Sequence, residues 1–110
     1  MATTDRTHDQ AVIELLRQDP ALAADYITAA LEDADQPGGQ VALLAALRQV
    51  AEAQGVATVA ERAGLARESL YRALSAKGNP TLKTLNAALR GLGLRLTVKE
   101  ALKDPRTRAA

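Results

Sequence analysis

The chain of 110 residues contains no cysteine and a single histidine, His8. Disulfides and thiolate metal sites are therefore excluded, and one histidine near the N-terminus cannot supply the ligands of a structural zinc site. We expect neither a metal nor a cofactor.

Long apolar runs are also missing. The longest, residues 41–47, is far shorter than the roughly 18 residues of a membrane-spanning helix. The first ten residues, MATTDRTHDQ, lack the apolar core of a secretion signal. These features predict a cytoplasmic protein with no membrane partner.

Large aromatic side chains are scarce, since the chain has no Phe and no Trp, although 47% of its residues are hydrophobic. The core must therefore be built from Leu, Val, Ile and Ala packed between closely approaching elements. This composition predicts an all-α fold.

The residue types that catalysis needs are sparse as well. General acid/base chemistry needs a positioned pair of titratable groups in a pocket, and a chain with one terminal His and no Cys offers no convincing nucleophile and base. We expect a protein that is not an enzyme.

Charge is divided unevenly along the chain, although the formal net charge is only +1. Residues 1–39 hold two arginines and eight acidic residues, a balance of −6, and residues 40–110 hold 12 basic and five acidic residues, a balance of +7. Such a division predicts two surfaces with partners of opposite charge.

The acidic half predicts two helices. The first begins near Asp9 as its N-cap, and the second begins at Asp19 and Pro20, a pair typical of a helix start. Residues 36–39, QPGG, form the clearest internal boundary. We therefore expect an acidic N-terminal helical extension over residues 1–38, a main domain over 39–98 and a frayed tail over 99–110.

The basic half predicts four helices, over about residues 40–54, 58–63, 67–76 and 81–91, with Thr81 as the N-cap of the last. In the first of these helices we expect Arg48, Gln49 and Glu52 to lie outside the core. A short helix, a glycine turn at Gly64 and a second short helix are the ordered parts of a helix-turn-helix domain of the lambda-repressor-like type.

In such a domain the second short helix enters the major groove of DNA, so its exposed polar residues become candidates for contact. Arginine can donate to a guanine edge, glutamate can accept from cytosine, and hydroxyls can bond either a base or a phosphate. The candidate base-reading residues are Arg67, Glu68, Ser69 and Arg72. The candidate phosphate contacts are Thr58, Tyr71, Lys77, Asn79, Thr81 and Lys83. The competing interpretation is a solvated helix face with an ion pair between Glu68 and Arg72.

Residues 94–98, LRLTV, alternate between apolar and polar, which predicts a short strand with Leu94, Leu96 and Val98 on one face. A single strand in a helical chain needs a partner, and the same strand of a second copy would supply it. The pattern therefore predicts a homodimer.

The stretch GLARESLYRALSAKGNPTLKTLNAALRGLGLRL, residues 64–96, resembles Cro and the phage repressors, and more closely the antidotes of bacterial addiction modules. The preceding DYITAALEDAD and ALLAALRQVAEAQGV resemble the N-terminal half of that family. The resemblance implies an antitoxin of a type II toxin-antitoxin module that binds a RelE/ParE-class toxin and represses its own operon by binding double-stranded operator DNA. Ala57-Thr58 and Ala66 depart from the family pattern, which often has Ser-Gln and a Ser or Thr cap at these places.

A basic toxin would suit the acidic half of the chain, and its candidate contacts are Tyr26, Ile27 and Leu31. The competing interpretation is that these helices only fold back onto the main domain. Two other functions stay open: a stand-alone phage-like transcriptional repressor, and a protein-interaction adaptor that retains the fold without binding DNA.

Overall fold

The computed structural model describes the backbone of residues 2–101 and the side chains of residues 8–101. Every regular element in residues 2–101 is a helix, which confirms the all-α prediction. The helices are α1 (Ala2–Gln18), α2 (Leu22–Glu32), α3 (Gly39–Gln54), α4 (Val56–Ala63), α5 (Arg67–Ala73) and α6 (Leu82–Gly91). No helix in this part of the chain is both long and apolar enough to cross a membrane.

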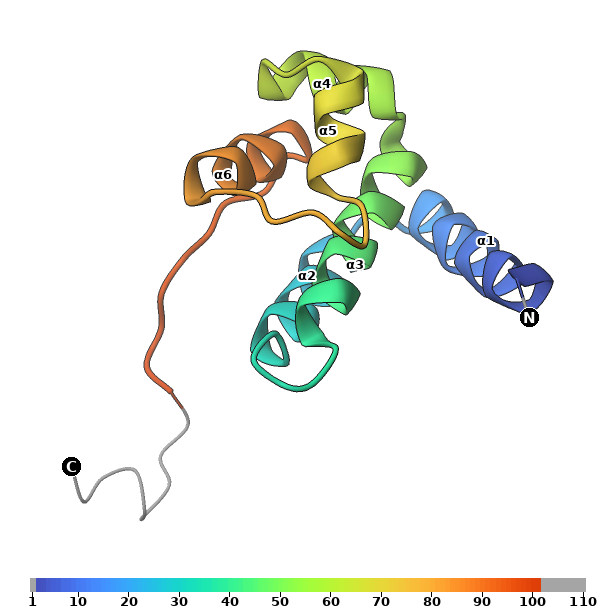
Figure 1. Ribbon diagram of the computed structural model, residues 1–110, viewed down its shortest axis with the longest axis horizontal. Helices are drawn as coiled ribbons and strands as arrows, with labels where there is room; N and C mark the ends of the chain where they lie inside the picture. Colours follow the sequence, from blue (N-terminus) through green and yellow to red (C-terminus); the bar gives the residue numbers. More distant parts are fainter. Residues whose placement is uncertain (1, 102–110) are drawn as a thin grey trace.

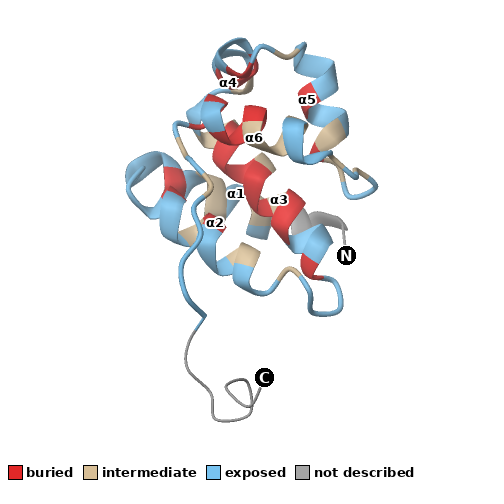
Figure 2. Cartoon of the chain, turned by 90° about the vertical axis from the view of Figure 1, so that its left-hand side faces the viewer, coloured by how far each residue is buried: buried red, intermediate tan, exposed pale blue. Residues whose placement is uncertain are grey.

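Helix α3 is the centre of the bundle. Figure 1 shows it running through the middle of the molecule, with α4, α5 and α6 gathered toward its C-terminal end. It contacts α1, α2 and α4. Most of its buried residues lie between Leu43 and Ala51, in the middle of the helix, which is red in Figure 2. Leu44, Leu47 and Val50 on this helix are at most 2% exposed. The small side chains of the core let neighbouring helices approach α3 from several sides.

The N-terminal helices share this core. Leu16 of α1 and Ala23 and Ile27 of α2 belong to the same buried cluster as the leucines of α3. Residues 1–38 were predicted as an extension, and in the folded chain α1 and α2 supply part of the apolar cover of α3.

Helices α4 and α6 approach each other closely at Gly91. A Cβ atom at this position would lie 2.5 Å from the carbonyl oxygen of Val59 and 3.1 Å from the Cβ of Ala63. Any larger residue would therefore push α6 away from α4. This contact braces α4, which is only eight residues long and needs tertiary packing to be stable.

Helix boundaries show where local signals succeed and fail. Thr81 caps α6 as predicted, since its Oγ1 accepts a hydrogen bond of 3.1 Å from the backbone N–H of Thr84. Helix α4 begins at Val56, two residues before the predicted start, because Gly55 takes the N-cap position. Helix α5 ends at Ala73 and not at residue 76. Just beyond the helix, both the backbone N–H and the hydroxyl of Ser75 donate to the carbonyl oxygen of Arg72, at 3.3 and 2.9 Å.

The predicted starts of the first two helices were wrong. Helix α1 already begins at Ala2, so Asp9 lies inside it. Asp19 lies in the turn between α1 and α2. Its backbone N–H donates to the carbonyl oxygen of Leu15 at 2.9 Å, and its own carbonyl oxygen accepts from the backbone N–H of Leu22 at 3.0 Å. Helix α2 then starts at Leu22 without a side-chain cap.

Residues 94–98 have no regular secondary structure in the single chain. Leu94 and Leu96 are half-buried against the core, and Val98 is 99% exposed. The predicted strand needs a second copy to pair with, so it stays a prediction. Residues 99–101 are exposed, and the rest of the predicted tail, residues 102–110, lies outside the described residues.

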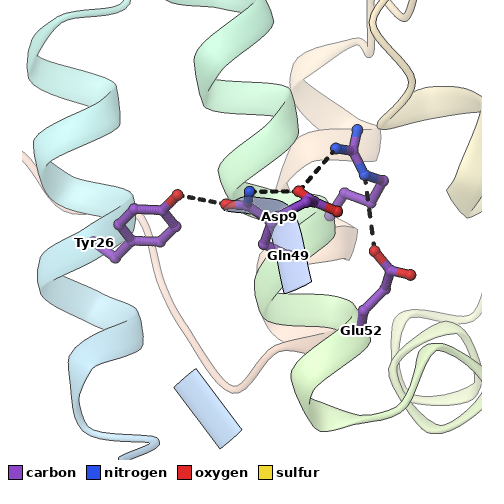
Figure 3. A network of polar contacts seen from close by, with 5 residues as sticks. Asp9, Tyr26, Gln49 and Glu52 are labelled. Atoms are coloured by element: carbon purple, nitrogen blue, oxygen red, sulfur yellow. Dashed lines mark hydrogen bonds and ion pairs between the residues drawn. The ribbon is translucent and has the colours of Figure 1, made fainter. Parts of the chain in front are cut away.

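A polar network joins α1, α2 and α3 (Figure 3). Gln49 on α3 accepts a hydrogen bond from the hydroxyl of Tyr26 on α2 and donates one of 2.6 Å to Asp9 on α1. Asp9 also lies 3.6 Å from the guanidinium of Arg48. The prediction that Gln49 lies outside the core was wrong, because its side chain is aimed between the two N-terminal helices and the residue is only 5% exposed.

Replacing Gln49 with Leu should lower the free energy of unfolding by about 1–3 kcal/mol, because the Tyr26 hydroxyl and the Asp9 carboxylate lose their amide partner. Urea denaturation followed by helical circular dichroism measures the change. Adding Tyr26→Phe should cost less in this background than in the wild type, since the hydroxyl no longer has a partner to lose. Gln10→Leu, at an exposed position of α1, is the control and should stay within about 0.5 kcal/mol. Strict additivity of the two core substitutions would contradict the network.

Burial raises the pKa of Tyr26 above its ordinary value of 10.0; the Asp9 carboxylate raises it further, while Arg48 lowers it. A raised pKa in the folded chain means that the protonated phenol is favoured by folding. The resulting stabilisation is complete below about pH 10 and is lost as the pH rises through the folded-state pKa. Wild-type stability should therefore fall more steeply than that of Tyr26→Phe at alkaline pH. Tyrosinate absorbance of Tyr71→Phe, which reports Tyr26 alone, should show a midpoint above 10; a midpoint at or below 10 would refute this.

Candidate nucleic-acid interface

Helix α5 is held by its inner face and leaves its outer face in solvent. It follows α4 through a short connection in which Gly64 has a φ of +71°, a conformation that side chains other than glycine rarely adopt. Leu70 and, just after the helix, Leu74 are at most 2% exposed and anchor it to the core. All four candidate base-reading residues are exposed: Arg67, Glu68, Ser69 and Arg72.

A groove of about 450 Å³ runs between α5 and the start of α6. It brings together two of the candidate base-reading residues, Ser69 and Arg72, with three candidate phosphate contacts, Lys77, Asn79 and Thr81. We name these lining residues together the α5 groove. Residues separated along the chain by a helix end and a turn thus share one surface.

The other candidates lie outside the lining of the α5 groove. Arg67 and Glu68 stand in the first turn of α5, and Tyr71 is 42% exposed on the same helix. Thr58 is exposed near the start of α4, and Lys83 is exposed near the start of α6. Their exposure leaves all five accessible to a ligand.

Hydrogen bonds fix the loop that borders the α5 groove. The side-chain amide of Gln40 on α3 donates to Asn79 Oδ1 at 3.5 Å, which links the loop to the bundle. Thr81 Oγ1 is already occupied by the cap of α6 and lies 3.1 Å from the hydroxyl of Thr84. A phosphate contact by Thr81 would therefore share its oxygen with the cap. The link to Gln40 has no signal in the local sequence pattern.

The basic side chains of this surface make no ion pair within the described part of the chain. Ion pairs there join Arg17 to Glu14, and Arg48 to Asp9 and to Glu52. The alternative interpretation, a solvated helix face, included a pair between Glu68 and Arg72, and no such pair is formed within 4.0 Å. The cationic groups of α5 thus face solvent and are available to an anion.

Helix α5 also starts without a side-chain cap. Its N-cap residue, Ala66, is extended and provides no acceptor for the first backbone N–H groups. Loss of a Ser or Thr cap typically costs about 1 kcal/mol. The helix therefore depends on Leu70 and Leu74 for its position.

The candidate toxin contacts on α2 are directed toward the bundle. Ile27 is 3% exposed, and Tyr26 is half-buried with its hydroxyl bound to Gln49. Leu31 is half-buried against the core. A partner could reach Ile27 only if α2 separated from α3. The exposed residues of this helix include the acidic Asp25 and Glu32.

Among the described residues, no group of three or more His, Asp or Glu side chains lies close enough together to hold a metal ion. The site is an exposed helix and a shallow groove, not an enclosed pocket.

The described residues form a small bundle of six helices, and the candidate binding site lies on the exposed face of one of them, α5. The family described as "Probable addiction module antidote protein" matches residues 7–100. The chain therefore belongs to this family of addiction-module antidotes.

An uncharacterized protein of Haemophilus influenzae is 39% identical to the chain over 59 residues. The match covers 54% of this chain and 61% of that relative, so the two are compared over less than two thirds of the relative's length. No solved structure matches the chain significantly.

Proposed function

We propose that the protein is the antitoxin of a type II toxin-antitoxin module, that it neutralises a RelE/ParE-class toxin, and that it represses its own operon by binding DNA. Helices α4 and α5 would act as a Cro-type helix-turn-helix, with α5 as the recognition helix. A homodimer paired through residues 94–98 would place two copies of α5 in successive major grooves, with half-sites about 34 Å apart.

The observation that carries the DNA-binding proposal is the α5 groove. Its lining joins two base-reading candidates on α5, Ser69 and Arg72, to cationic and hydroxyl groups between α5 and α6, Lys77 and Thr81. Lysine and threonine side chains are suited to contact phosphate. Base edges and phosphates lie side by side in a major groove, so a reader needs both kinds of side chain on one surface.

A stand-alone phage-like repressor would use the same α5 surface and would have no toxin. The family membership favours the antidote role over this alternative. An adaptor without DNA binding would fit the departures at Ala57-Thr58 and Ala66, and direct binding measurements separate it from a repressor. We also propose that the protein acts without catalysis in the cytoplasm, with no metal or cofactor.

The DNA-binding proposal predicts selective binding to duplex DNA from upstream of the gene, weakening as salt is added because phosphates release counterions. Arg67→Ala and Arg72→Ala should each cost about 1–3 kcal/mol of binding free energy and reduce discrimination between operator and unrelated DNA. Fluorescence anisotropy at several salt concentrations measures both effects.

Arg17→Ala is the matched control for that experiment, because it removes the same charge from an exposed position on α1. It should leave operator selectivity unchanged. Equal losses in the control and the α5 variants, or equal binding to any DNA, would mean that α5 does not read bases.

Toxin binding is proposed to use the acidic side of α1 and α2. Deleting residues 1–38 would uncover the core face of α3, so neutralising exposed carboxylates is the cleaner test. We expect the double variant Asp25→Asn, Glu32→Gln to associate about tenfold more slowly with the protein encoded by the neighbouring gene. The association rate constant should also depend less on salt concentration. Glu61→Gln with Glu100→Gln is the matched control at exposed positions outside these helices. Surface plasmon resonance measures the rates, and unchanged association in the α2 variant would remove these acids from the contact.

A further inference from the structure

Three arginines from separate parts of the fold line a second groove. Arg62 near the end of α4, Arg90 near the end of α6 and Arg95 in the segment after α6 border a space of about 600 Å³ together with Asn86. We name this surface the arginine groove. It shares no lining residue with the α5 groove.

The charge of the arginine groove is one-sided. None of its lining residues is acidic, and the ion pairs within the described part of the chain involve other residues. Like charges gathered at one site repel one another, and an anionic ligand would relieve that repulsion. The guanidinium group is also the side chain best suited to bind a carboxylate with two parallel hydrogen bonds.

The arginine groove also contains apolar surface. Leu89, Leu94 and Leu96 are among its lining residues. Leu89 is 3% exposed, and the other two are half-buried, so parts of their side chains remain open to the groove. A surface that pairs cationic groups with leucine side chains suits a ligand with both carboxylates and apolar side chains.

We infer that the arginine groove binds an acidic segment of a partner protein, whose carboxylates pair with Arg62, Arg90 and Arg95 while an apolar side chain packs on the leucines. A DNA backbone offers phosphates to the arginines but no apolar group for Leu94 and Leu96. The groove is therefore a second binding surface, and its ligand differs from that of the α5 groove. The inference does not depend on DNA binding by α5.

The probe is a five-residue peptide of alternating Glu and Leu with blocked ends, titrated into the full-length ¹⁵N-labelled protein and followed by amide chemical shifts. The control peptide has Gln in place of each Glu. Shifts should concentrate at Asn86 and residues 93–96, and the control peptide should bind more weakly. Replacing Arg62, Arg90 and Arg95 together with Gln should weaken peptide binding by about tenfold or more, the combined effect of three surface ion pairs.

The matched variant replaces Arg67, Arg72 and Lys77 with Gln, which removes three positive charges from α5 and its groove. It should keep peptide binding. A variant that replaces only Arg62 and Arg90 with Gln leaves the proposed dimer segment 94–98 intact and should keep operator binding in the anisotropy assay. The inference is overturned if the Glu peptide produces no shifts, if the Gln peptide binds equally well, or if both triple variants lose affinity for the peptide to the same extent. If the peptide does not bind and the arginine-groove variant binds operator DNA more weakly than the wild type, the groove is a DNA contact instead.

Discussion

The burial of α3 is the constraint on which the rest of the bundle depends. Its apolar side chains need cover from several directions, and α1, α2 and α4 provide it. Gln49 is the one polar residue classed as buried among residues 8–101, and it lies where α1 and α2 meet α3. Its hydrogen bonds to Tyr26 and Asp9 select one arrangement of these helices, because another packing would leave a buried amide without partners.

Because α1 and α2 pack on α3, the surface of the protein is divided into regions with different chemistry. The buried residues of α2, Ala23 and Ile27, belong to the core, while Asp25 and Glu32 are among its exposed residues. Helix α5 is anchored by Leu70 and Leu74 and keeps its cationic face in solvent. The arginine groove lies on α4, α6 and the segment after α6. The basic half of the chain thus presents two separate cationic surfaces, and the bundle holds both in place through the close contact of α4 and α6 at Gly91.

Much of the fold could be predicted because its signals are local. Apolar spacing placed all six helices, and the Thr81 cap fixed the start of α6. Errors arose where a side chain had two physically reasonable uses. Asp9 and Asp19 resemble N-caps, yet Asp9 lies inside α1 and Asp19 lies in the turn that follows it. For the site, the exposure of Arg67, Glu68 and Arg72 was predicted from helical periodicity. The meeting of Arg62, Arg90 and Arg95 at one groove had no signal in the sequence.

By itself the sequence determined that the protein is helical, that its charge is divided between two halves, and which face of α5 is polar. These properties follow from composition and from local periodicity, which do not depend on how the helices pack. Only the tertiary structure decided that Gln49 is buried, that Ile27 packs against the core, and that the start of α6 joins α5 around one groove. These outcomes depend on how helices pack against one another. Residues 26 and 49, or 62 and 95, become neighbours only when that packing brings distant segments together.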